Sequence, residues 1–100
     1  MDEKIFRVLN DIGIPFLSGR DFIECAIKIV AEKGRISITK ALYPEIAIKF
    51  HTRSGLVERA IRHSISKAQK SKLESIFNKS NLTNSEFIYG LAKYLEIYNN

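Results

Sequence analysis

Residues 57–65, VERAIRHSI, bring together a carboxylate, two guanidinium groups and an imidazole at Glu58, Arg59, Arg62 and His63. Such groups suit three roles: a solvated helix face, acid–base catalysis, or the recognition of nucleic acid. On a helix, Glu58 and His63 would point about 140° apart, so they would not form an acid–base pair. We therefore expect no enzyme and no catalytic residue.

The basic charge of the chain is concentrated around these residues. From Lys49 to Lys72 there are seven basic residues and one acidic residue, a net charge of +6, against nine and ten elsewhere, a net charge of −1. A local excess of positive charge attracts polyanions such as DNA. A basic helix face that is merely solvated would explain the same charge.

Composition limits the class of protein. A chain of 100 residues with 45% hydrophobic and 27% charged residues is typical of one globular domain. It has no apolar run of the ~20 residues that a membrane span needs, and its first residues do not have the pattern of a secretory signal. One Cys and two His are too few for the usual structural zinc sites. We expect a cytoplasmic protein with no membrane association, metal or cofactor.

Apolar residues recur at helical spacing along the chain, and no strand alternation is evident. The pattern predicts an all-α fold, a single compact domain of about six helices over residues 1–100. The expected helices lie at about 5–12, 20–33, 44–51, 54–70, 73–77 and 84–98, with a helical turn at 37–42. Thr52 or Ser54 is the expected N-cap of the fourth of these, the basic helix.

The last helix has a recognisable start. Residues 83–86, TNSE, have the pattern of a capping box, in which Thr83 and Glu86 each accept the backbone N–H of the other. The predicted apolar stripe of this helix consists of Phe87, Ile88, Leu91, Leu95 and Tyr98.

On a helical wheel, the basic helix has an apolar face and a polar face. Val57 and Ile61 lie at the centre of the apolar face, and Arg59 lies almost opposite them. We therefore predict that this helix buries Val57 and Ile61 while it exposes Arg59 and Arg62.

A short helix, a brief turn and a longer helix with an exposed polar face indicate a helix-turn-helix at about residues 44–70. In this motif the second helix enters the DNA major groove, where Arg bonds guanine and Glu accepts from cytosine. Thr52, Arg53 and Ser54 at the helix start suit phosphate. Lys67 is either a phosphate contact or part of a solvated helix end.

The stretch SITKALYPEIAIKFHTRSGLVERAIRHSI resembles the C-terminal DNA-binding domain of the master sporulation response regulator of endospore-forming bacteria. LNDIGIP resembles the first helix of that family and TNSEFI its last helix, so the likeness covers most of the chain. It implies a six-helical domain that binds a short promoter box, often repeated in tandem. By position it implies base reading by Glu58 and Arg59, and it places in or beside the interface Thr52, Ser54, Arg62 and His63.

This sequence departs from the family pattern in three places. The family protein has an N-terminal receiver domain, whereas this chain begins at the first helix, so we expect no control through a receiver. Leu56 stands where the family is expected to carry Arg, so that one contact is lost or is replaced by a contact to a thymine methyl group. The segment before TNSE is shorter than in the family, where that region is linked to RNA polymerase.

We predict a sequence-specific, double-stranded-DNA-binding regulator of sporulation initiation, acting as a monomer or a weak DNA-assisted dimer, with RNA polymerase as a candidate partner. The alternative is an interaction module, without a receiver, that modulates a full-length regulator or RNA polymerase. The predicted base-reading residues are Glu58, Arg59 and Arg62. The predicted backbone or interface residues are Thr52, Arg53, Ser54, Leu56, His63 and Lys67.

Overall fold

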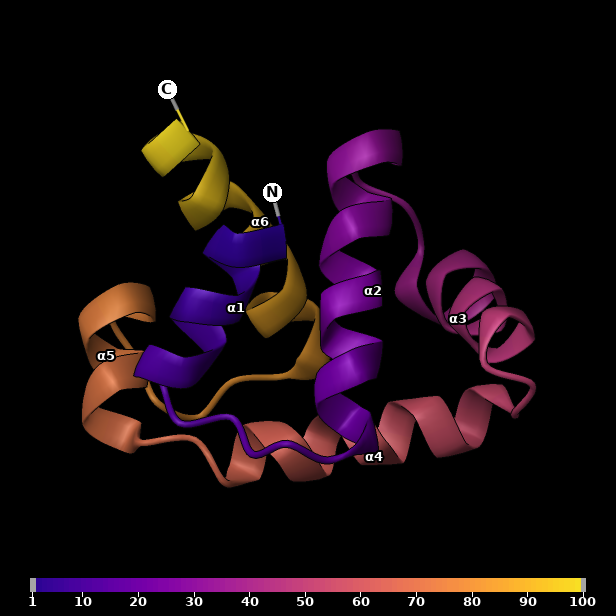
Figure 1. The fold of residues 1–100 in the computed structure, drawn as a ribbon, viewed down its shortest axis with the longest axis horizontal. Coiled ribbons are helices and arrows are strands. Elements are labelled where there is room, and N and C mark those ends of the chain that lie inside the picture. Colours follow the sequence, from indigo (N-terminus) through magenta and orange to yellow (C-terminus); the bar gives the residue numbers. More distant parts are fainter. Residues whose placement is uncertain (1, 100) are drawn as a thin grey trace.

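The computed structural model describes the backbone of residues 2–99 and the side chains of residues 3–95. Over this range the fold is all-helical, as predicted, and contains no strand (Figure 1). Its elements are α1 (Asp2–Asp11), α2 (Ser18–Lys33), the π-helical turn η1 (Ile38–Leu42), α3 (Tyr43–Lys49), α4 (Ser54–Ser66), α5 (Lys70–Phe77) and α6 (Asn84–Asn99).

The core forms where α2 packs against α4 and α6. In Figure 1, α2 stands on α4, which runs along the lower edge of the molecule. The predicted stripe of α6 is buried at Phe87, Ile88, Leu91 and Leu95, whereas the side chain of Tyr98 lies outside the described residues. Burial of each large apolar side chain contributes roughly 1.5–3 kcal/mol to folding. Among the described helices, none is long and apolar enough to cross a bilayer.

The capping box at the start of α6 is confirmed. Thr83 Oγ1 accepts the backbone N–H of Glu86 at 3.1 Å, and Glu86 Oε1 accepts the backbone N–H of Thr83 at 2.9 Å. Glu86 also accepts from Lys79 Nζ at 3.0 Å. These bonds occupy N–H groups that the helix cannot pair itself, so the first turn of α6 is well defined.

The loop between α1 and α2 is held by a buried arginine. Arg20 donates to the carbonyl of Ile14 at 2.7 Å and to Asn10 Oδ1 at 2.8 Å, which compensates for burying its charge. The carbonyl of Ile12, at the start of the same loop, accepts the backbone N–H of Gln69 at 2.8 Å. The chain after α4 is thereby attached to a segment far from it in sequence.

This attachment explains a correction to the predicted end of the basic helix. α4 ends at Ser66 instead of near residue 70, and Lys67 is its C-cap. The N–H groups of Lys67 and Ala68 bond carbonyls three residues back, which tightens the last turn. Gln69 is then extended, with φ −73° and ψ 119°, where it reaches the α1–α2 loop. The basic helix is therefore about one turn shorter than predicted.

The predicted N-cap of the basic helix is also wrong. Arg53 holds that position with φ −119° and ψ 151°, and no side chain makes a capping hydrogen bond there. Ser54 is the first helical residue, and the backbone N–H of Thr52 instead bonds the carbonyl of Ala47 at 2.9 Å. Thr52 is part of the tight turn after α3, and its hydroxyl does not cap α4.

One close approach between backbones determines how α2 sits on α4. Gly19, near the start of α2, lies so near to Ala60 and Ser64 that a Cβ atom there would overlap the Ala60 carbonyl and Ser64 Oγ. The Ser64 hydroxyl is buried and has no hydrogen-bond partner within the described chain. Steric fit, and not a polar contact, therefore holds the C-terminal half of α4 against α2.

Candidate nucleic-acid interface

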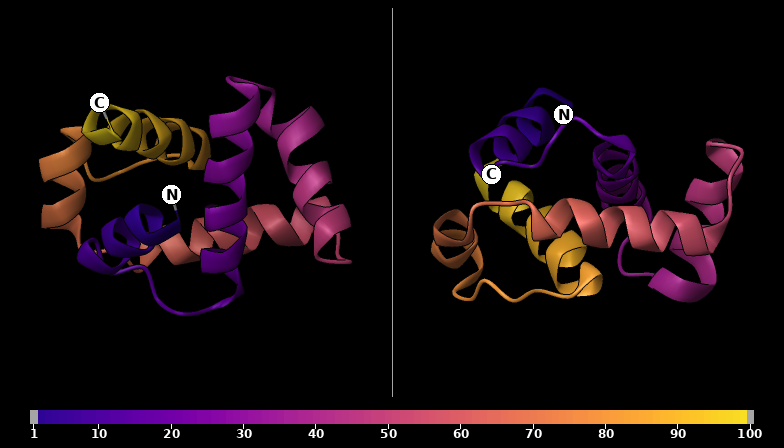
Figure 2. Two further views of the ribbon diagram at one scale, coloured as in Figure 1. Left: turned by 45° about the horizontal axis from the view of Figure 1, so that its top comes forward. Right: turned by 90° about the horizontal axis from the view of Figure 1, so that it is seen from below.

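α3 and α4 are joined by a tight turn. α3 ends at Lys49, and His51 adopts a left-handed conformation with φ 55° before α4 begins at Ser54. The two helices contact each other along the chain's most basic segment. Seen from below, α4 crosses the near face of the molecule in front of the other helices (Figure 2, right). This arrangement agrees with the predicted helix-turn-helix.

The two faces of α4 are as predicted. Val57 and Ile61 are completely buried, whereas Arg59 and Arg62 are exposed. The Arg59 guanidinium forms no hydrogen bond or ion pair with any residue in the described part of the chain. The inner face thus anchors the helix and leaves the Arg59 donors available for an outside acceptor.

Two of the predicted base-reading residues pair with each other. Arg62 Nη1 donates to Glu58 Oε2 at 2.7 Å, and the two side chains are 63% and 33% exposed. Pairs at this spacing on a solvated helix contribute only about 0.3–0.5 kcal/mol. The contact is therefore easily exchanged for one with a charged ligand.

Both residues border an open hollow of ≈ 670 Å³, which lies between η1, α4 and the start of α6. Its wall includes Glu58, Arg62 and Asn84. The Arg62 side chain consequently has open space into which it can turn when it leaves Glu58.

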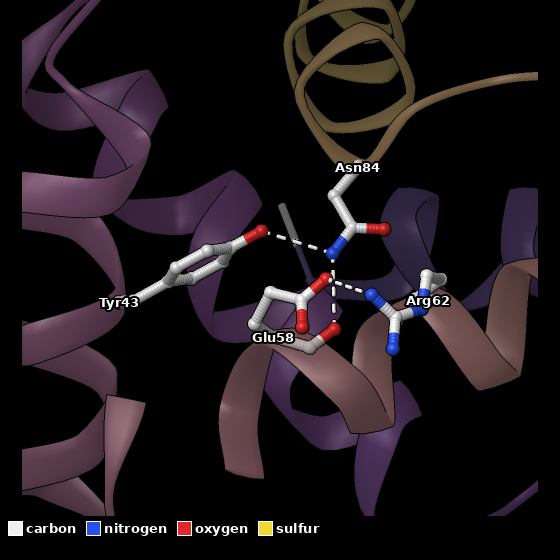
Figure 3. A network of polar contacts seen from close by, with 4 residues as sticks. All are labelled: Tyr43, Glu58, Arg62 and Asn84. Carbon is white, nitrogen blue, oxygen red and sulfur yellow. Dashed lines mark hydrogen bonds and ion pairs between the residues drawn. The ribbon is translucent and has the colours of Figure 1, made fainter. Parts of the chain in front are cut away.

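Asn84 links α6 to both helices of the pair. Its Nδ2 donates to Tyr43 Oη at 2.9 Å and to the backbone carbonyl of Glu58 at 3.0 Å (Figure 3). Burial raises the pKa of the Tyr43 hydroxyl, and the hydrogen bond from Asn84 acts in the opposite direction. The phenol therefore stays neutral.

The role of Asn84 was not predicted from the sequence, although one signal was present. Asn84 precedes Phe87 and Ile88 by three and four residues, so it belongs to the apolar stripe of α6. A polar residue on a buried stripe needs a partner.

The remaining predicted residues lie at the two ends of α4. Thr52, Arg53 and Ser54 adjoin its start, and Leu56 is 39% exposed one residue before Val57. His63 and Lys67 are exposed toward its far end. A helix of 13 residues is about 20 Å long, so one small ligand would not touch both ends, whereas a groove of DNA would.

Two other kinds of site, a nucleophilic cysteine and a metal site, have little support. Cys25 is partly buried, and burial raises the pKa of its thiol, which keeps it protonated and poorly nucleophilic. Across the residues that the structure describes, no three His, Cys, Asp or Glu side chains gather in a way that would hold a metal ion.

The comparison with known families gives one match. A family model described as the sporulation initiation factor Spo0A C terminal matches residues 5–95. The matched region runs from Ile5 in α1 to Leu95 in α6, and it includes all of α4.

Proposed function

This chain belongs to the family of the sporulation initiation factor Spo0A C-terminal domain, and from that premise we propose that it regulates transcription by reading the DNA major groove with α4. The family is a DNA-binding one and is not a family of enzymes. What α4 recognises, and through which residues, is our proposal.

The observation that carries the proposal is the state of Arg59. Its guanidinium lies opposite the buried Val57 and Ile61, in the N-terminal half of α4, and has no partner among the described side chains. Recognition helices contact base edges with this half. Arg59 therefore donates to guanine O6 and N7, the commonest specific contact in the major groove.

Glu58 and Arg62 complete the reading surface. On DNA, their ion pair opens, Glu58 accepts from cytosine N4, and Arg62 turns to a neighbouring base. Around them, backbone or interface contacts come from Thr52, Arg53, Ser54, Leu56, His63 and Lys67. The protein binds as a monomer or as a weak dimer assembled on DNA, and RNA polymerase is a candidate partner for the bound form.

Selection from a random duplex pool, at a stated salt concentration, tests the proposal. We expect enrichment of one short box. The affinity of the protein for duplex DNA should also fall steeply as the salt concentration rises, with a slope of log affinity against log salt of about −0.9 for each phosphate neutralised. With Arg59→Ala, the enriched box should lose its preference for guanine at one position. An unenriched pool and a flat salt response from the unaltered protein would overturn DNA reading.

The second candidate function is an interaction module for a full-length regulator or RNA polymerase. One observation favours it: the α1–α2 region exposes Phe16 by 72% and Leu17 by 51%, and DNA reading by α4 does not require these side chains. Binding to either protein without any duplex enrichment would favour this candidate over the first.

A further inference from the structure

Asn84 lies outside the helix pair in sequence but is bonded to both of its members. It is the first residue of α6 and is 9% exposed. Its two amide hydrogens go to Tyr43 Oη in α3, 41 residues away, and to the Glu58 carbonyl in α4, 26 residues away. Figure 3 shows the amide between the two helices.

The bond to α4 is made to its backbone. The acceptor is the carbonyl of Glu58, the residue directly before Arg59. A carbonyl oxygen has two lone pairs, so it can accept from Asn84 and from the helix's own N–H four residues on. The contact therefore constrains the position and rotation of the helix axis, whatever rotamer the Glu58 side chain adopts.

In the C-terminal half of α4, no side-chain hydrogen bond to another helix is found within the described residues, and the nearest polar attachment is the bond from the Gln69 N–H to the Ile12 carbonyl, three residues beyond its end. In that half, the buried Ser64 hydroxyl lacks a partner in the described part of the molecule, and the fit depends on the absence of a Cβ at Gly19. Apolar packing tolerates small sliding and rotation better than a hydrogen bond of 3.0 Å does, because hydrogen bonds are directional. That hydrogen bond lies at the half of α4 that carries Arg59.

We propose that Asn84 is a positioning residue for base recognition: its amide sets the depth and rotation at which α4 presents Arg59 to the major groove. Asn84 itself is buried and touches no DNA. The inference rests on the proposed function, since it concerns how well Arg59 reaches a base. A displacement of about 1 Å is enough to spoil a bidentate contact, whereas phosphate contacts by flexible side chains tolerate it.

The test compares affinity for the selected box with affinity for random duplex. Asn84→Ala should lower the ratio of the two about tenfold, a loss on the scale of one base contact, and should leave affinity for random duplex unchanged. Ser85→Ala is the matched control, because Ser85 is the next residue of α6 and no hydrogen bond from its side chain is found in the described chain; it should keep the ratio. All measurements are made below the onset of melting of each variant.

Tyr43→Phe is a second, milder variant in case Asn84→Ala does not fold. It keeps the ring in the core and removes one acceptor of the amide, so the ratio should fall less than in Asn84→Ala. An unchanged ratio in Asn84→Ala, or in Tyr43→Phe if that is the variant that folds, would overturn the positioning role. A fall of both affinities by one factor would also overturn it, because it is the signature of a lost folded fraction.

A double-variant cycle shows whether Asn84 acts through Arg59. Combined with Arg59→Ala, Asn84→Ala should lower the ratio no further, since the contact that it positions is already absent. Additive losses would overturn the inference and leave the proposed function intact. If Arg59→Ala alone left the ratio unchanged, base reading by Arg59 would fail, and the positioning role with it.

Discussion

Arg62 Nη1 lies 2.7 Å from Glu58 Oε2, one turn back along α4. In the free protein this pair occupies two of the three side chains proposed to read bases. Arg59, between them in sequence, makes no such contact within the described residues. The reading surface is therefore divided into one group ready to bind and two that must first separate.

Arg59→Ala should cost roughly 1–3 kcal/mol of affinity for the selected box and little on random duplex, because a bidentate guanine contact is lost. Lys67→Ala is the control on the same basic segment. Lys67 is the C-cap of α4, about 20 Å from its start, so its loss should weaken all sequences equally or have no effect. Equal losses on both duplexes for Arg59→Ala would make Arg59 a phosphate contact. Titration of both duplexes at one salt concentration provides the comparison.

Glu58→Ala should raise affinity for random duplex about two- to fivefold and relax the choice of base at one position. The substitution removes a carboxylate that phosphate repels, and it also releases Arg62 from its ion pair. Repeating the pool selection with this variant measures both effects. A loss of affinity for every duplex would show that Glu58 mainly holds Arg62 in place.

Gly19→Ala should destabilise the fold by about 1–3 kcal/mol, because the new Cβ overlaps the Ala60 carbonyl and Ser64 Oγ. Gly55→Ala is the matched control: a Cβ there meets no atom within 4 Å, so the change should stabilise α4 by about 0.5–1 kcal/mol. Urea denaturation measures both. If the two variants had equal stability, the α2–α4 contact would be looser than the structure shows.

The capping box predicts a dependence of stability on pH. Hydrogen bonds from the Thr83 backbone and from Lys79 hold the pKa of Glu86 below its ordinary value of about 4.3. Because the folded pKa is depressed, the stabilisation is present above the unfolded pKa and is lost as the pH falls through the folded one. Glu86→Gln keeps a capping side chain without the charge. At neutral pH the unaltered protein should therefore have a higher Tm than this variant, and the difference in Tm should disappear in acid, where Glu86 is protonated. Melting curves from neutral pH to about pH 3 test this; a constant difference in Tm would contradict it.

Local patterns were enough to predict much of this molecule. The period of apolar residues predicted that Val57 is buried and that Arg59 is exposed, as the structure shows. The capping box was predictable because it depends only on residues three apart. The end of α4 was not predictable in this way, because it depends on a bond from Gln69 to Ile12, which are far apart in sequence. The two hydrogen bonds from Asn84 to α3 and α4 were not predicted for the same reason.

These two hydrogen bonds also determine which part of this protein would be needed to transfer its sequence specificity to another protein. A fragment cut around α3 and α4 would contain every proposed base contact and still lack the amide that bonds Tyr43 and the Glu58 carbonyl. The smallest part of the protein that could transfer its sequence specificity is therefore discontinuous in sequence. It consists of α3, α4 and the first turn of α6. A graft that contained only the recognition helix would transfer its charge, but it would lose the hydrogen bonds that position the helix for base recognition.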